Sequence, residues 1–126
     1  MRRWYLRRIA RRVAGPAADL GCGAGELLDL LPPGSEGFDV NPAAVACCRS
    51  RGLTAHGVSG GDIVGCVSAL PPGRFGTAVL CHVLEHLDDP VGVLRGVLAA
   101  CAAVGMRRVI VVVPGRKIGR ASCRER

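Results

Sequence analysis

Short apolar runs recur along this chain at intervals that predict five strands separated by helices. The strands are expected at residues 17–20, 36–40, 53–58, 75–81 and 107–113. The run at 75–81 is apolar enough to be buried on both faces, as in a parallel sheet. Strands that alternate with helices favour right-handed crossovers between parallel strands, which places the chain in the α/β class.

Helical patterns fill the intervals between these strands and also precede the first one. Residues 1–13 form an amphipathic pattern, with Leu6, Ile9 and Val13 on one side and arginines around the rest. Further helices are predicted at 26–31, 42–51, 63–70 and 90–104. Two of them begin with a capping residue followed by proline, Asn41-Pro42 and Asp89-Pro90, and this order favours a helix start.

A glycine-rich stretch joins the first strand to the helix predicted at 26–31, and it reads Asp19-Leu20-Gly21-Cys22-Gly23-Ala24-Gly25-Glu26. Alternating glycines let the backbone turn sharply and leave no Cβ to keep a ligand away. The first N–H groups of a helix have no partner within it, so they can bind a polar ligand. The stretch therefore predicts a site for a nucleotide-like ligand.

The spacing of the glycines separates one kind of nucleotide from another. A dinucleotide fingerprint, G-x-G-x-x-G, requires glycine at position 26, where this chain has Glu26. A carboxylate at the helix start opposes a phosphate. A P-loop is excluded because no Gly-Lys-Ser/Thr follows. On these residues alone, an ordinary glycine turn stays open as the alternative.

Two motifs resemble those of the class I S-adenosylmethionine (SAM) methyltransferases. Residues 19–25 resemble the first motif of that family, D-L-G-C-G-x-G, and residues 83–87 resemble V-L-E-H-L, which is common in its small-molecule members. The resemblance implies a Rossmann-like, doubly wound parallel sheet in the order 3-2-1-4-5, lacking the last two strands of the family. It also implies SAM as the cofactor and methyl transfer to a small-molecule acceptor.

The resemblance further implies how SAM is held. The glycines would admit its methionine part, and Asp19 would orient the loop and the methionyl ammonium. Asp62 would hold the adenine amino group, while Ile63 packs on one face of the adenine ring and Val40 covers the other. The candidate cofactor-binding residues are Asp19, Gly21, Cys22, Gly23, Gly25, Asp39, Val40, Asp62, Ile63 and His82. By itself, Asp62 is equally consistent with a helix cap.

The position of Asp39 in the sequence predicts a ribose-binding role independently of the family resemblance. It stands at the end of the second strand, about 20 residues after the glycine stretch, where an acid holds the ribose in Rossmann-like folds. Its two oxygens can accept both hydroxyl protons of the diol. A part in the cap of the following helix is the alternative.

His82 and His86 are the candidate catalytic residues. They follow the fourth strand, together with Glu85. A histidine in that position can act as a general base toward a methyl acceptor. The alternative is that Glu85 and His86 only brace the loop, since polar clusters also serve structure.

Composition limits the other possibilities. The 126 residues correspond to at most one domain, and no apolar run is long enough to span a bilayer. The N-terminus lacks the apolar stretch of a secretory signal, so a cytoplasmic protein is expected. Seven cysteines without a C-x-x-C motif favour free thiols over disulfides, and no metal site is expected.

Two other functions remain open at this stage. One is a fragment of a dinucleotide-binding oxidoreductase, which Glu26 opposes. The other is a nucleic-acid-binding module formed by the arginine-rich N-terminal helix, because the net charge is +7. Few aromatic residues are present to stack on bases, which disfavours nucleic acid as a partner. The methyl acceptor and the oligomeric state cannot be read from the sequence.

The chain divides into three segments in this interpretation. Residues 1–14 are a basic amphipathic helix, residues 15–116 an incomplete SAM-binding domain, and residues 117–126 a non-native tail. The tail, Lys-Ile-Gly-Arg-Ala-Ser-Cys-Arg-Glu-Arg, resembles the translation of a widely used sequencing adapter. It is expected to form no sixth strand, leaving the fifth strand as an open edge on an aggregation-prone, inactive fragment.

Overall fold

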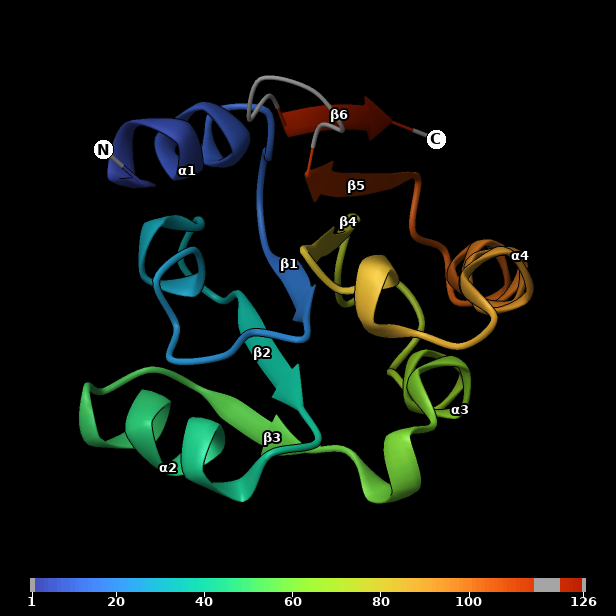
Figure 1. Cartoon of the computed structure of the whole chain (residues 1–126), viewed down its shortest axis with the longest axis horizontal. Helices are drawn as coiled ribbons and strands as arrows, with labels where there is room; N and C mark the ends of the chain where they lie inside the picture. The colour runs from blue at the N-terminus through green and yellow to red at the C-terminus, as the bar shows by residue number, and fades with distance from the viewer. Residues whose placement is uncertain (1, 115–120, 126) are drawn as a thin grey trace.

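A single six-stranded sheet is the centre of the computed structural model, which describes residues 2–114 and 121–125. The strands are β1 (Ala17–Leu20), β2 (Glu36–Asp39), β3 (Ala55–Gly57), β4 (Thr77–Cys81), β5 (Arg108–Pro114) and β6 (Ala121–Glu125). They lie in the order β3-β2-β1-β4-β5-β6 (Figure 1). The first five are parallel, which confirms the predicted α/β class and the order 3-2-1-4-5.

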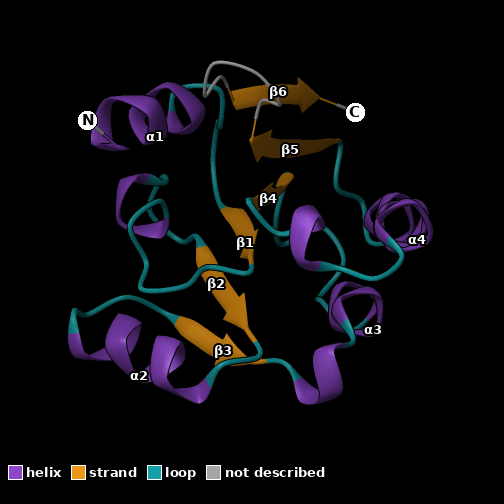
Figure 2. Ribbon diagram, viewed as in Figure 1, coloured by secondary structure: helices purple, strands orange, loops and turns teal. Residues whose placement is uncertain are grey.

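Helices cover both faces of the sheet (Figure 2). The α-helices are α1 (Arg2–Ala10), α2 (Pro42–Ser50), α3 (Ile63–Ser68) and α4 (Pro90–Ala103), and the short 3-10 turns are η1 (Leu28–Leu30), η2 (Ser59–Gly61) and η3 (Leu84–His86). One apolar core lies under α1, η1 and α2, and the other lies under α3 and α4. Successive residues of β1 point into opposite cores, Ala17 into the first and Ala18 into the second.

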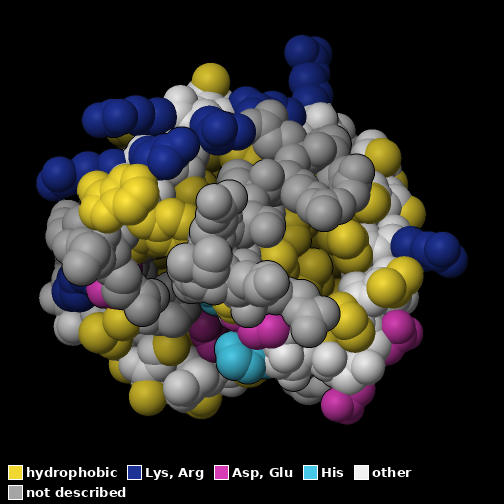
Figure 3. All heavy atoms as spheres, turned by 45° about the horizontal axis from the view of Figure 1, so that its top comes forward, with side chains coloured by type: hydrophobic (Ala, Val, Ile, Leu, Met, Phe, Trp, Pro, Cys, Tyr) yellow, Lys and Arg dark blue, Asp and Glu magenta, His cyan; other side chains and the backbone are white. Residues whose placement is uncertain are grey.

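The amphipathic character predicted for the N-terminal helix is confirmed. Leu6 and Ile9 are buried in the core under α1, together with Val13 just after the helix. Burying an aliphatic side chain of this size contributes about 1.5–3 kcal/mol, so this side attaches the helix to the sheet. Arg7 and Arg8 are exposed, as are Arg11 and Arg12 after the helix, and basic side chains gather over α1 in Figure 3.

Three helices begin at side-chain caps. The Asn41 Oδ1 accepts a hydrogen bond from the N–H of Ala43 at 3.0 Å, and Pro42 follows as the first helical residue. The same device opens α4, where the Asp89 Oδ1 accepts from Gly92 at 3.0 Å. Asp62 caps α3. Each such cap contributes about 1 kcal/mol, which is why the sequence located these starts closely.

The prediction of a helix at residues 26–31 is wrong, because the structure has only the single 3-10 turn η1 in that segment. The N–H of Asp29 donates to the carbonyl of Gly25, but the next two N–H groups donate only three residues back, to Leu27 and Leu28. Pro32 cannot continue a helix, so six residues were available. A segment that short gains too few hydrogen bonds to offset the cost of nucleation.

The expectation that residues 117–126 add no strand is also wrong. Residues Ala121–Glu125 form β6, which pairs antiparallel with β5 in a register that joins Pro114 to Ala121 and Ile110 to Glu125. An edge strand offers unpaired backbone groups, and these accept any extended segment, whether or not its side chains alternate. β5 is therefore not the open edge on which the expectation of aggregation rests.

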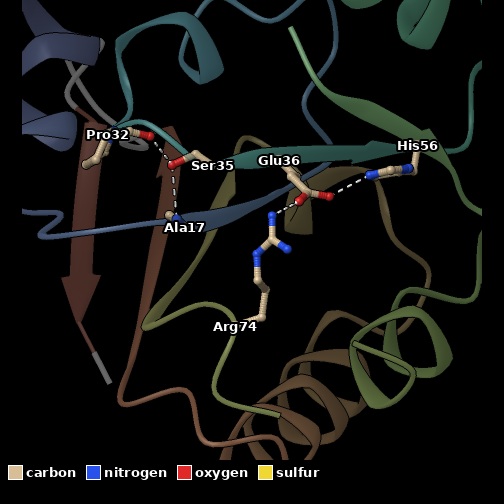
Figure 4. A network of polar contacts seen from close by, with 6 residues as sticks. All are labelled: Ala17, Pro32, Ser35, Glu36, His56 and Arg74. Atoms are coloured by element: carbon tan, nitrogen blue, oxygen red, sulfur yellow. Dashed lines mark hydrogen bonds and ion pairs between the residues drawn. The ribbon is translucent and has the colours of Figure 1, made fainter. Parts of the chain in front are cut away.

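A polar network ties together the amino ends of the strands (Figure 4). The Glu36 carboxylate, whose side chain is 16% exposed, pairs with the guanidinium of Arg74 and lies 2.6 Å from Nε2 of His56. Next to it, the Ser35 hydroxyl accepts from the N–H of Ala17 at 3.0 Å. These contacts join β1, β2 and β3 to the loop before β4 and leave the opposite, carboxyl ends free for a site.

A substitution at Gly37 in β2 tests how tightly the glycine loop and η1 pack on the sheet. A Cβ at Gly37 would lie 2.7 Å from the Cys22 Sγ and 2.8 Å from a methyl group of Leu28. We expect Gly37→Ala to lower the free energy of unfolding by about 1–3 kcal/mol, because the core would be overpacked.

Gly57 in β3 is the matched control, because a Cβ there would meet no atom within 4 Å. Gly57→Ala should change the free energy of unfolding by no more than about 0.5 kcal/mol. Chemical denaturation measures both variants. Equal losses at the two positions would contradict the packing described here.

Candidate functional site

A cleft of about 350 Å³ opens at the carboxyl ends of the strands. It is lined by Leu20, Gly21, Phe38, Asp39, Val40, Val58, Gly61, Ile63, Cys66, His82, Val83, His86 and Leu87. The chain leaves β1 for β2 on one side and for β4 on the other, and ligands of open α/β sheets bind at such a switch point. Of the predicted site residues, the cleft brings together Gly21, Asp39, Val40, Ile63, His82 and His86.

Several apolar residues of the lining were missed from the sequence, although Val40 and Ile63 were predicted. Leu20 and Phe38 are register partners at the ends of β1 and β2, and both border the cleft. Their positions at or next to the carboxyl ends of two adjacent strands were the available signal. Val83 stands in the motif at residues 83–87, whereas Cys66 gave no signal, because only the packing of α3 against the sheet brings it to the cleft.

The glycine loop has the backbone that its sequence predicts. Gly21, Gly23 and Gly25 have φ angles of 80°, 55° and 89°, a region that side chains rarely adopt. A Cβ at Gly21 would also lie 2.6 Å from a methyl group of Val83, and one at Gly25 would lie 2.7 Å from a methyl group of Leu53. Space next to Gly23 is open. The loop is thus closely packed against neighbouring side chains at Gly21 and Gly25 and is accessible at Gly23.

Asp39 joins this loop to β2. Its Oδ2 accepts a hydrogen bond from the N–H of Gly23 at 2.8 Å, and its Oδ1 accepts from the N–H of Asn41 at 2.9 Å. The helix cap belongs to Asn41, so Asp39 is not the cap of α2. Each carboxylate oxygen has a further lone pair, and the side chain borders the cleft. Asp39 can therefore accept hydrogen bonds from a ligand without releasing the loop.

Asp62 lies where the alternative placed it, at the start of α3. Its Oδ1 accepts from the N–H of Gly65 at 2.8 Å, and its residue is exposed. Its neighbours Gly61 and Ile63 line the cleft, whereas Asp62 does not. A contact with adenine stays a prediction for Asp62, and the cap is the role the contacts give it.

Asp19 is the most unusual group near the loop. Its residue is 2% exposed, and its Oδ2 has no hydrogen-bond partner. Burial, and secondarily the negative charge of Asp39, raise the pKa of Asp19 from 3.8 to about 7. A carboxyl group in such surroundings is poised to lose its proton when a cation arrives.

Cys22 points away from the cleft into the core. Its Sγ lies 3.9 Å from the Sγ of Cys48, whose thiol donates to the carbonyl of Gly23 at 3.2 Å. Burial, and secondarily the charge of Asp19, hold the pKa of the Cys22 thiol well above its usual range. Cys22 therefore supports the loop from below as a neutral thiol.

His82 occupies the end of β4 with an uncommon backbone. Its φ angle is 59°, and its N–H donates to the carbonyl of Val112 at 2.8 Å. The ring contacts two side chains: Nδ1 lies 3.3 Å from the Glu85 carboxylate, and Nε2 lies 3.4 Å from the Tyr5 hydroxyl. His86 borders the cleft but is far more exposed, with 77% of its side chain accessible.

The described residues offer no group of three or more histidine, cysteine or acidic side chains arranged to hold a metal ion. Within the same residues, no helix is both long and apolar enough to cross a membrane. The polar side chains that line the cleft, Asp39, His82 and His86, can form hydrogen bonds with hydroxyl or amino groups of a ligand.

Comparison with protein families agrees with this geometry. The family model described as "Methionine biosynthesis protein MetW" matches residues 6–124. The chain belongs to the MetW family. The match runs from α1 into β6, so it includes most of residues 117–126, and the resemblance of that segment to a translated adapter stays a prediction. Comparison with curated proteins gives no match.

Solved structures share the fold of this MetW-family chain. A SAM-dependent methyltransferase from Archaeoglobus fulgidus superposes with a TM-score of 0.68 at 23% identity, over 90% of this chain and 54% of its own. The glycopeptide N-methyltransferase MtfA, solved with SAM, superposes with a TM-score of 0.64 at 19% identity, covering 98% of this chain and 65% of its own. A SAM-dependent methyltransferase from Clostridium acetobutylicum superposes with a TM-score of 0.61 at 19% identity, covering 90% of this chain and 50% of its own.

These likenesses show that the chain has the class I methyltransferase fold. The chain spans between half and two thirds of the length of these three structures. The parallel sheet in the order 3-2-1-4-5 that the two sequence motifs implied is confirmed, and β6 adds an antiparallel strand that was not expected.

The buried carboxyl of Asp19 predicts a pH dependence of stability. The unfolded chain loses this proton near pH 3.8 and the folded chain near 7, so the folded state binds the proton more tightly between them. The free energy of unfolding should therefore fall as the pH rises from about 4 to about 7, by at most about 4 kcal/mol from this group.

Asp19→Asn should remove this fall, and Asp29→Asn should not. Asp29 is a surface carboxylate 3.5 Å from Arg51, so its loss is expected to cost less than about 1 kcal/mol. Denaturation curves across this pH range compare the three proteins. A pH profile of Asp19→Asn parallel to that of the wild type would show that the carboxyl is already ionised in the fold.

Proposed function

We propose that this MetW-family chain binds SAM in the cleft and that the protein transfers the methyl group of SAM to a small-molecule acceptor. The observation that carries the proposal is the Asp39 carboxylate, which joins the glycine loop to β2 and also borders the cleft. A carboxylate at this point of the fold suits the two hydroxyl groups of a ribose.

The other residues of the cleft support the same ligand. The space next to Gly23 is open, so a ligand can approach the backbone of the loop there. In the proposed complex the methionine part of SAM lies along Gly21, Gly23 and Gly25, and the adenine lies between Val40 and Ile63, with Asp62 toward its amino group. Val40 is 54% exposed, an apolar side chain that a bound ring would cover.

Asp19 gives the cleft a preference for a cation. Its Oδ2 has no partner in the fold, and SAM carries positive charge on both its sulfonium and its ammonium group. Binding next to a positive charge favours the ionised carboxylate, so Asp19 would orient the loop toward the methionyl part. A dinucleotide brings negative phosphates to this loop instead, where Glu26 and Asp19 oppose them.

SAM supplies a methyl group bound to a positively charged sulfur. The work of this chain is to hold SAM and to border the acceptor, because methyl transfer depends chiefly on placing two reactants in line at short distance. His82 or His86 would accept a proton from the acceptor as it reacts. The small-molecule nature of the acceptor and a cytoplasmic location stay predictions.

Asp39 provides the direct test of SAM binding. We expect Asp39→Ala to weaken SAM binding roughly 10- to 100-fold, because hydrogen bonds to a charged group contribute about 1.5–3 kcal/mol. Asn41→Ala is the matched control, since it removes a neighbouring hydrogen bond of the same loop and leaves the carboxylate in place. Calorimetry measures both. Unchanged SAM affinity in Asp39→Ala would refute the ribose assignment.

A second measurement separates the methyltransferase from the oxidoreductase alternative. The wild-type chain is titrated with SAM and with NADH under identical conditions. We expect SAM to bind and NADH to bind far more weakly, because the loop carries carboxylates and no phosphate-binding helix start follows it. Tighter binding of NADH would end the methyltransferase proposal.

A further inference from the structure

His82 is held by two side chains, one close to it in sequence and one far from it. Tyr5 comes from α1 and Glu85 from η3, and the imidazole lies between them with its two nitrogens facing different partners. The Tyr5 and His82 ring centroids are 5.9 Å apart. Three elements therefore converge on one ring that also borders the cleft.

The chemistry of the two partners assigns the protons of a neutral His82 ring. An ionised carboxylate can only accept hydrogen bonds, so the Glu85 carboxylate 3.3 Å from Nδ1 favours the ring form with the N–H on Nδ1. In a neutral imidazole the other nitrogen is then a bare acceptor. The Tyr5 hydroxyl can donate, and it lies beside that second nitrogen. Tyr5 thus marks Nε2 as the basic atom of His82.

The backbone supports a role in the cleft. The φ angle of 59° at His82 is uncommon for a residue with a side chain, although histidine tolerates it better than most. Residues held in such conformations cluster at active sites and ligand contacts. The hydrogen bond from the His82 N–H to Val112 fixes this conformation at the end of β4.

His86 lacks this support. Its Nε2 lies 4.0 Å from the Glu85 carboxylate, beyond hydrogen-bond distance, and its side chain is 77% exposed against 33% for His82. The same carboxylate is closer to His82. Between the two histidines predicted from the sequence, the contacts favour His82.

We propose that Glu85 and Tyr5 are positioning residues that hold His82 with its proton on Nδ1, so that Nε2 receives the proton of the methyl acceptor. The proposal rests on the proposed function. The acceptor's lone pair forms the bond to the methyl carbon, the carbon–sulfur bond breaks, and its electron pair stays on sulfur as a neutral thioether. The acceptor's proton moves to Nε2 in place of the hydrogen bond from Tyr5, and Glu85 faces the resulting imidazolium.

Nitrogen NMR of the ¹⁵N-labelled 126-residue chain tests this assignment, because it distinguishes a protonated ring nitrogen from a bare one. The sequence has three histidines, His56, His82 and His86. In alkaline buffer, with the rings neutral, we expect His82 to show a protonated Nδ1 and a bare Nε2. This is the opposite of the tautomer that free histidine favours.

His56 is an internal control for which the opposite tautomer is expected. Its carboxylate partner, Glu36, faces Nε2 instead of Nδ1, so the same reasoning gives His56 a protonated Nε2. Glu85→Ala should return His82 to the ordinary tautomer and leave His56 unchanged. Glu36→Ala should change the His56 signals only. Tyr5→Phe should keep the proton of His82 on Nδ1 and shift the Nε2 signal toward that of a nitrogen without a hydrogen bond.

SAM calorimetry on the same samples separates the two proposals. SAM binding together with the expected His82 tautomer supports both. SAM binding with the His82 proton on Nε2, or with His82 signals that Glu85→Ala leaves unchanged, overturns the positioning role alone. Absence of SAM binding overturns the proposed function, and the proton role of His82 with it. The wild-type spectrum decides the tautomer even if a variant fails to fold.

Discussion

The parallel pairing of β1 with β2 on one side and β4 on the other determines where the candidate functional groups lie. Because the chain crosses to opposite sides of β1, the loops that follow these strands diverge and leave a cleft between them. The glycine loop follows β1, Asp39 is the last residue of β2, and His82 follows β4. Their convergence is a consequence of strand order, since none of them is adjacent to another in sequence.

A second constraint is the close approach of the loop to the sheet. Gly21 and Gly25 leave space that the side chains of Val83 and Leu53 occupy, and Cys22 lies against β2. The backbone amide of Gly23 is then held by Asp39 at 2.8 Å. The loop is thus shaped before any ligand binds, which lowers the ordering cost of binding.

Charge in this fold is divided between two regions. Exposed arginines lie along α1, where basic side chains gather in Figure 3, whereas Asp19 and Asp39 lie together beneath and beside the cleft. Burial of Asp19 without a partner for its Oδ2 costs stability, and such costs are typical of sites that bind charge. The net charge of +7 therefore says little about the cleft, whose described lining includes Asp39 and no arginine or lysine.

The sequence by itself determined the features that depend on near neighbours along the chain. Strand β1 follows from a short apolar run, the caps at Asn41 and Asp89 follow from side chains that bond within three residues, and the glycine loop follows from backbone freedom. Pro32 is also a local feature, and it limits η1 to a single turn. The tertiary structure decided the existence of β6, which forms because the edge of β5 accepts a partner.

The site divides in the same way. The positions of Gly21, Asp39 and His82 at strand ends were predictable from spacing, but the partners of His82 and the isolation of Asp19 were not. Tyr5 reaches His82 across 77 positions of sequence, and the raised pKa of Asp19 sums the desolvation by every element packed around it. Such contacts depend on how the helices pack on the sheet, and local sequence patterns do not specify that arrangement.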